Sequence, residues 1–167
     1  AVWNGASTGD GYAVGNTYDY NHTTNWVGST IDDSLAGFIL TGNLTLSLDA
    51  NRTTVATGLN LTYSGAYNLS LLSDSATTRT LTLGGNVVAD ALDGDQTITI
   101  GSASRPVTVS TGSARSVVVG AGDTLLIDGV FAGNSVINKF GPGTLTLSGS
   151  TNNDFNTFAV NEGKLFL

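Results

Sequence analysis

The chain has 167 residues, with 22 glycines, two prolines and no cysteine or methionine, so disulfides, thiolate metal sites and a cysteine nucleophile are excluded. Only 11% of the residues are charged, against about 25% in an ordinary globular domain, which argues against long amphipathic helices. The net charge of -7 and the scattered basic residues argue against binding to nucleic acid or to an anionic membrane. No stretch has the roughly 18 consecutive apolar residues that a membrane-spanning helix needs.

Residues 1–38 hold six of the 13 aromatic side chains, including both tryptophans, set among glycine, asparagine and threonine, with little strand periodicity. They are predicted to form an irregular N-terminal cap that covers the first edge of a stack of strands. An alternative use of two of these rings, Trp3 and Trp26, is stacking on a carbohydrate or another partner. The chain begins at Ala1, as expected for a mature product whose leader has been removed.

Residues 39–167 are predicted to be a series of short strands in which apolar residues alternate with threonine, serine or asparagine. The spacing from Ile98 to Val107, Val117 and Leu125 suits two strands per coil of about twenty residues. A sandwich built from hairpins would also give such spacing, but Asn-Gly and Asp-Gly hairpin signals are scarce. The predicted strands are 42–48, 59–63, 67–71, 80–83, 97–100, 106–109, 116–119, 124–127 and 144–147.

Three pairs of apolar residues near the C-terminus share one phase, because each pair follows the previous one by twenty residues. Within a strand, residues two apart lie on one face, and a step of this size is typical of one solenoid coil. We therefore predict one all-β domain, a right-handed parallel β-helix of about six or seven coils. The pairs are Leu125 and Ile127, Leu145 and Leu147, and Leu165 and Leu167.

The run Lys139-Phe-Gly-Pro-Gly-Thr-Leu-Thr-Leu-Ser-Gly-Ser, followed by Val160-Asn-Glu-Gly-Lys-Leu, resembles the autotransporter-associated β-strand repeat of bacterial passenger proteins. The pairs Trp3-Asn-Gly and Asn25-Trp resemble the start of such modules. The sequence departs from the repeat around Asn156, where the family has a glycine and a different turn is expected here. The resemblance implies a right-handed β-helix that is secreted or held on the bacterial cell surface, without enzymatic activity.

The residues that could take part in catalysis are better interpreted as ordinary surface residues. His22 is the sole histidine and lies in a polar run, which favours a solvated loop residue over a catalytic base. Consecutive carboxylates such as Asp32 and Asp33 point to opposite faces of an extended strand, and we interpret them as solvated turn residues. We therefore expect that the protein is not an enzyme.

The acidic group Asp90, Asp93 and Asp95 is a weak candidate for calcium, because oxygen ligands in a glycine-containing loop suit this ion. Its spacing matches neither an EF-hand loop nor a calcium-binding nonapeptide repeat. No cofactor is otherwise expected.

Two functions remain open from the sequence. The first is a structural module that stacks head-to-tail into a homopolymer, a fibre or surface layer, through an open C-terminal strand edge. The second is an adhesin or carbohydrate-binding fragment of a larger surface protein that uses Trp3 and Trp26. The predicted assembly edge consists of Leu145, Leu147, Lys164, Leu165, Phe166 and Leu167.

Overall fold

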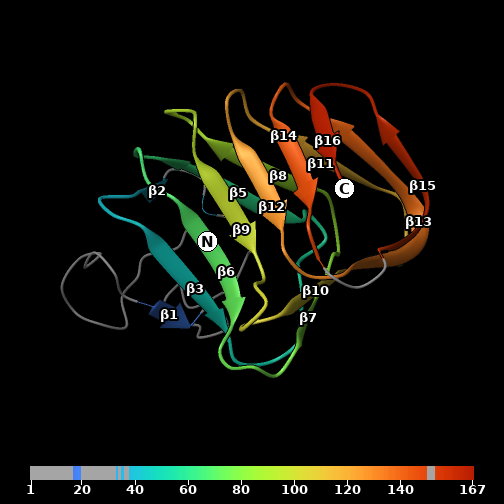
Figure 1. Ribbon diagram of the computed structural model, residues 1–167, viewed down its shortest axis with the longest axis horizontal. Coiled ribbons are helices and arrows are strands. Elements are labelled where there is room, and N and C mark those ends of the chain that lie inside the picture. The colour runs from blue at the N-terminus through green and yellow to red at the C-terminus, as the bar shows by residue number, and fades with distance from the viewer. Residues whose placement is uncertain (1–16, 20–32, 34, 36–37, 150–152) are drawn as a thin grey trace.

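A computed structural model of the chain describes residues 17–19, 33, 35, 38–149 and 153–167 (Figure 1). All regular structure in these ranges is β-strand, and every strand pair between them is parallel. Parallel pairing excludes a sandwich of hairpins, whose neighbouring strands are antiparallel. The prediction of a parallel β-helix, or β-solenoid, is confirmed.

One wall of the solenoid is a seven-stranded sheet whose strands lie side by side in chain order, with no break in register from β3 to β16 (Figure 1). The buried side chains alternate with half-exposed ones along each central strand, which fixes which face looks inward. Its strands are β1 (Thr17–Asp19), β3 (Leu44–Leu48), β6 (Leu69–Ser73), β9 (Thr97–Ile100), β12 (Thr124–Ile127), β14 (Thr144–Leu147) and β16 (Lys164–Phe166).

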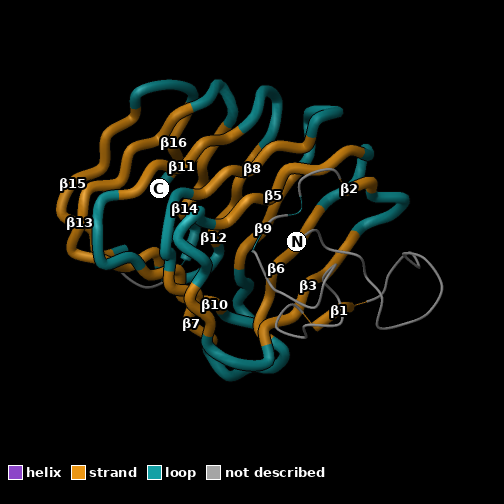
Figure 2. The backbone as a smooth tube through the Cα atoms, turned by 180° about the vertical axis from the view of Figure 1, so that it is seen from behind, coloured by secondary structure: helices purple, strands orange, loops and turns teal. Residues whose placement is uncertain are grey.

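The second sheet has nine strands and lies behind the first, as the view from the back shows (Figure 2). It divides into two arms that meet at one long strand, β13 (Phe131–Phe140), which pairs with β10 through its first residues and with β11 through its last. The other strands are β2 (Phe38–Ile39), β4 (Arg52–Thr53), β5 (Leu59–Ser64), β7 (Arg79–Thr82), β8 (Val87–Ala91), β10 (Val107–Ser110), β11 (Arg115–Val119) and β15 (Asp154–Val160).

The length of a coil changes along the solenoid. The register places Leu69 opposite Ile98 and Ile98 opposite Leu125, so the middle coils take 29 and 27 residues and contain three strands each. From Leu125 to Leu145 to Leu165 the step is 20 residues, because a single strand, β13 in one coil and β15 in the next, replaces two strands and the turn between them. The twenty-residue step is therefore confirmed for the last coils and wrong for the middle ones. The structure has about five turns, fewer than predicted.

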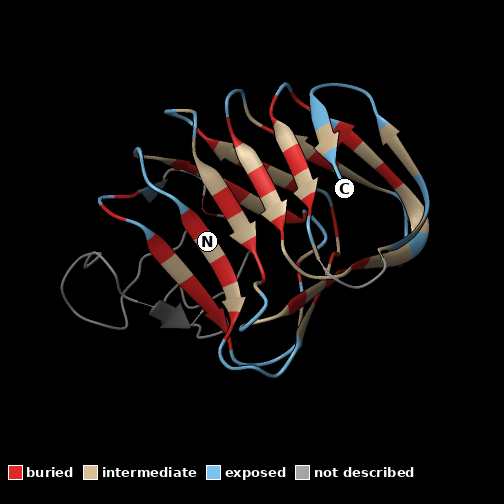
Figure 3. Ribbon diagram, viewed as in Figure 1, coloured by how far each residue is buried: buried red, intermediate tan, exposed pale blue. Residues whose placement is uncertain are grey.

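The core consists of ladders of leucine, isoleucine and valine that run from coil to coil and are buried throughout the central strands (Figure 3). Leu69, Ile98, Leu125 and Leu145 form one such ladder, with 0% of each residue exposed. Burial of a side chain of this size contributes about 1.5–3 kcal/mol, and each coil gains it only by contact with its neighbours.

Part of the segment predicted as a cap continues the solenoid. Strand β1 lies inside residues 1–38 and pairs in parallel with β3, while Leu35 is buried and its amide donates to the carbonyl of Asn60 in β5. The described portion of this segment therefore extends both sheets by one layer.

Candidate functional site

The C-terminal edge of the solenoid is made by β15 in one sheet and β16 in the other. Leu165 continues the ladder of Leu125 and Leu145 but is only half-buried, and Leu167 is 82% exposed. On the other wall, Val160 lies opposite the inward-facing Lys139 and is 47% exposed. These side chains occupy core positions that no further coil of the described chain covers.

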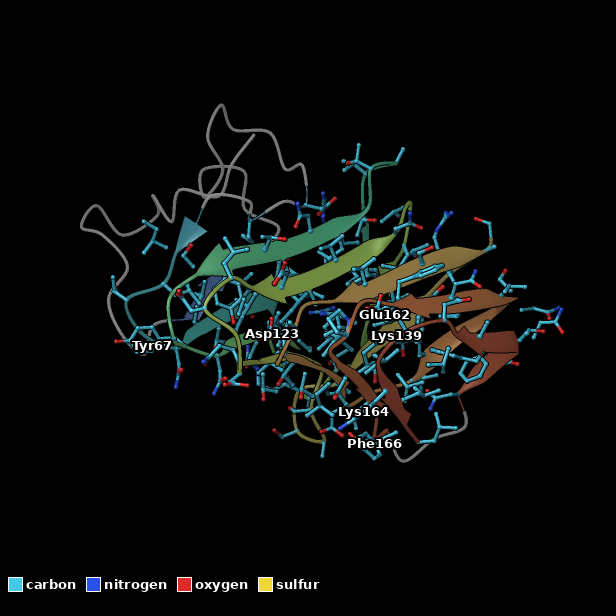
Figure 4. All side chains as sticks on the ribbon, turned by 90° about the horizontal axis from the view of Figure 1, so that it is seen from above. Tyr67, Asp123, Lys139, Glu162, Lys164 and Phe166 are labelled. Carbon is cyan, nitrogen blue, oxygen red and sulfur yellow. The ribbon has the colours of Figure 1, made fainter. Side chains whose placement is uncertain are left out.

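The predicted edge residues divide between this edge and the core. Leu145 and Leu147 are buried in β14, one coil inside the edge, because β16 covers them. Lys164 and Phe166 face the outside of β16 and are exposed, as their labelled side chains show (Figure 4). Lys164, Leu165 and Phe166 therefore lie in the edge strand β16, with Leu167 directly after it, and of these four Leu165 and Leu167 lie at core positions.

Sequence reasoning missed the second half of the edge. Residues 156–158 lie within the strand β15 rather than in a turn, with a register shift against β13 between Gly133 and Val136. Phe155 and Phe158 pack against the core and against each other, edge to face, with ring centroids 5.2 Å apart. The two phenylalanines that flank Asn156 and Thr157 are the feature of the sequence from which this strand could have been predicted. They widen the apolar edge to both sheets.

Lys139 binds the last two turns of the solenoid together from inside the core. Its ammonium Nζ donates to the carbonyl oxygens of Phe140 at 2.8 Å, Gly141 at 2.6 Å and Glu162 at 3.2 Å, while 0% of the residue is exposed. Figure 4 shows Lys139 beside Glu162. Three donors meet three acceptors, so the group is fully satisfied. Gly163 lies against this cluster, because an added Cβ would lie 2.3 Å from the carbonyl oxygen of Gly143, 2.5 Å from that of Gly141 and 2.8 Å from Nζ.

Burial lowers the pKa of Lys139, and the nearby carboxylate of Glu162 opposes this change by favouring the charged form. The residues that pair with Lys139 in the neighbouring strands β11 and β15 are both valines, Val117 and Val160. Lys139 thus has a structural role, because it fixes the turns that lead into β14 and β16.

The weak calcium candidates do not converge on one point. Asp93 accepts a hydrogen bond from the amide of Gly65 in the preceding coil, whereas Asp90 and Asp95 lie beside Gly120 and Gly122 in the following one. No group of three or more acidic or histidine residues suited to a metal is found in the described part of the chain.

Asp123 is a buried carboxylate that sequence reasoning did not single out. Its Oδ2 accepts the amide of Ala91 at 2.7 Å and its Oδ1 accepts the amide of Gln96 at 3.0 Å, so it closes the turn of the coil before it. Burial raises the pKa of Asp123, the two amide bonds oppose the rise, and the charges of Asp90 and Asp95 add to it.

Asp33 is also buried, which corrects its interpretation as a solvated turn residue. Its carboxylate accepts two hydrogen bonds from the guanidinium of Arg52, at 2.7 and 2.9 Å, and one from the amide of Val55 at 2.7 Å. A bidentate pair of this kind is short and oriented. It joins the N-terminal segment to the turn that follows β4. Asp32, His22, Trp3 and Trp26 lie outside the described residues.

A surface cavity of about 290 Å³ lies between the turn at 101–106 and residues 128–130. Its one charged group is Asp128, whose Oδ1 accepts the hydroxyl of Ser148 at 2.9 Å, and the remaining lining is hydroxyl-bearing or apolar. Hydrolysis of a glycoside usually needs two carboxyl groups that face each other across the sugar. This cavity has a single carboxylate.

Comparison with known protein families, curated proteins and solved structures gives no match to this chain. The described residues contain no helix that is long and apolar enough to cross a membrane. The candidate site therefore rests on the geometry of the C-terminal edge.

Proposed function

We propose that the chain is an extracellular structural module, without catalytic activity, that stacks head-to-tail with further copies of itself into a fibre or surface layer. The observation that carries the proposal is the uncovered core at the C-terminal edge. The resemblance of residues 139–165 to a repeat of bacterial passenger proteins supports the extracellular surface location.

The edge offers both of the interactions that hold the coils together within the chain. The outer backbone groups of β15 and β16 have no strand partner in the described residues, and an unpaired edge strand pairs readily with another strand. Beside them, Val160, Leu165 and Leu167 present apolar surface, and full burial of such side chains contributes about 1.5–3 kcal/mol each.

Among the described residues, the opposite end of the same sheet is also an edge without a further strand partner. Strand β1 is the first strand of the seven-stranded sheet and pairs with β3 on one side. Pairing of β16 with β1 of a second copy would keep all strands parallel. Such a contact joins two different surfaces and does not close on itself, so it builds a filament.

The test is sedimentation and electron microscopy of the purified protein over a range of concentrations. We expect filaments that lengthen with concentration, and we expect Leu167→Asp to leave monomers, because a carboxylate would be buried in the contact. The matched control is Leu92→Asp: Leu92 is 59% exposed in the turn after β8, away from the edge, and this variant should still form filaments.

Wild-type protein that stays monomeric at all concentrations would contradict the proposal. So would a dimer that does not grow, since that result indicates a symmetric contact between two C-terminal edges. Equal loss of assembly in both variants would show that the C-terminal edge is not the contact.

A further inference from the structure

The seven-stranded sheet keeps one register from its first strand to its last. Tyr18 in β1 pairs with Leu46 in β3, and the later strands continue this row without a shift. Thr17 begins the neighbouring row, which ends at Phe166 in β16, so Leu167 continues the row of Tyr18. The row of Tyr18 is Leu46, Leu71, Ile100, Ile127 and Leu147, and the row of Thr17 is Thr45, Ser70, Thr99, Leu126 and Thr146.

The two rows begin and end at opposite ends of the molecule. Strands β1 and β16 are the first and last strands of the sheet (Figure 1). Six strand spacings of about 4.8 Å place them about 29 Å apart. A contact between β1 and β16 therefore joins two copies of the chain and never two ends of one copy.

We propose that the joint between two copies continues this register, so that Leu167 of one copy lies opposite Tyr18 of the next. Phe166 then lies opposite Thr17. This inference rests on the proposed head-to-tail stacking and specifies its geometry. From β3 to β14 the row that leads to Leu167 is buried at every strand. The joint therefore covers an exposed side chain at the end of a core ladder.

Other registers are less favourable. A shift by one residue would move Leu167 from the core row to the outer row, because successive residues of a strand face opposite sides. A shift by two residues keeps the faces but moves the incoming copy by about 6.6 Å along the strands, so the two cores would no longer overlap fully. Strand β16 cannot slide to follow such a copy, because Lys139 bonds the carbonyl oxygens of Gly141 and Glu162 in the last two turns.

The proposed joint also fixes the rise of the filament per copy. Each copy contributes seven strands to the sheet, and the spacing across the joint equals the spacing inside the copy. Seven spacings of about 4.8 Å give a rise of about 34 Å. A further strand layer between two copies would raise it to about 38 Å. Electron micrographs of the filaments measure this repeat.

The test of the register is disulfide cross-linking. The chain has no cysteine, so every disulfide comes from introduced thiols. Thr17→Cys with Phe166→Cys places the two Cα atoms about 4.8 Å apart across the joint, which is within the range of a disulfide. Under a mild oxidant we expect a ladder of covalent oligomers that a reductant separates, and filaments with a rise of about 34 Å.

The matched control is Thr17→Cys with Lys164→Cys. Lys164 and Phe166 are two residues apart in β16 and both are exposed. In the proposed register the Cα atoms of residues 17 and 164 are about 8 Å apart, which is too far for a disulfide. This variant should form filaments of the same rise without covalent oligomers.

The outcomes separate the register from the stacking itself. Filaments that cross-link through the control pair or through neither pair would overturn the register and leave head-to-tail stacking in place, as would a rise of about 38 Å. Wild-type protein without filaments would overturn both. Covalent dimers as the main product of the single variant Phe166→Cys would also overturn both, because they indicate a symmetric contact between two C-terminal edges.

Discussion

At the scale of single residues, the solenoid is closed by a few buried polar side chains that bond the backbone of a neighbouring coil. Asp33, Asp123 and Lys139 are all fully buried, and each satisfies backbone amides or carbonyls that a turn would otherwise leave unpaired. Leaving such a group without its partner costs about 1–3 kcal/mol. These residues therefore contribute to stability through the turns, where the apolar ladders do not reach.

Replacement of Asp123 by asparagine should lower the free energy of unfolding by about 1–3 kcal/mol, because both carboxylate oxygens accept amides and an NH2 group would face a donor. Urea unfolding measures the change. Asp128→Asn is the control, since Asp128 is half-exposed and accepts a hydroxyl that can turn, and its change should stay within about 0.5 kcal/mol. Equal effects of the two substitutions would contradict this role.

Lys139 should make stability depend on pH in the alkaline range. Because burial lowers its pKa below the usual 10.5, the unfolded chain binds more protons than the folded chain between the folded pKa and 10.5. The contribution of Lys139 to stability therefore rises as pH increases through that window.

The measurement is the urea midpoint of the wild type against Lys139→Met at increasing alkaline pH. The difference in favour of the wild type should grow with pH. Lys164→Met is the control: Lys164 is exposed in β16, and this variant should follow the wild type. A difference that does not change with pH would show that the folded chain does not perturb Lys139.

At the scale of the elements, asparagines next to the strands bond from one coil to the next. Oδ1 of Asn43 accepts the amide of Asn68, and Oδ1 of Asn68 accepts the amide of Thr97, at 2.9 and 2.8 Å. Asn51 and Asn86 do the same for the other sheet. Three of these four asparagines begin Asn-x-Ser/Thr sequences, the pattern of glycosylation acceptors. In this structure their side-chain oxygens accept hydrogen bonds that join neighbouring coils.

Asn68→Ala should therefore destabilise the protein by about 0.5–1.5 kcal/mol, the usual net contribution of one hydrogen bond. Asn68→Asp retains an oxygen at the same position and should recover most of the loss. Thermal unfolding of the two variants beside the wild type checks this. If alanine and aspartate were equally destabilising, the side-chain acceptor would not be the cause.

At the scale of the whole molecule, stability is shared between neighbouring coils, because each coil packs only on the coils beside it. Among the described residues, central strands such as β9 have a strand partner on both sides, whereas β16 has one, β14. Backbone amides of the last coil should therefore exchange with solvent faster than those of β9 and β11.

Hydrogen exchange followed by mass spectrometry measures this gradient in dispersed protein. Exchange in β16 should slow at concentrations where filaments form, while that in β9 stays unchanged. Exchange that is uniform along the chain would show that the solenoid opens as one unit.

Much of the fold follows from local patterns. Alternation of leucine or isoleucine with threonine in residues 97–100, 124–127 and 144–147 predicted three strands within their observed bounds. Strand β13 was not predicted, because Phe131–Phe140 contains glycine, serine and asparagines that interrupt the alternation. Its position is fixed by two neighbours, β10 and β11, which sequence spacing does not show.

The sequence by itself determined the inward and outward faces, since a strand places every second residue on one side and water favours threonine over leucine there. Only the tertiary structure decided the coil lengths, the burial of Asp33, Asp123 and Lys139, and the position of Leu145 and Leu147 inside the edge. Those outcomes depend on which strands become neighbours, and parallel pairing joins residues 20 to 30 positions apart. At the C-terminal end, the same pairing leaves Leu165 and Leu167 as the uncovered part of the core.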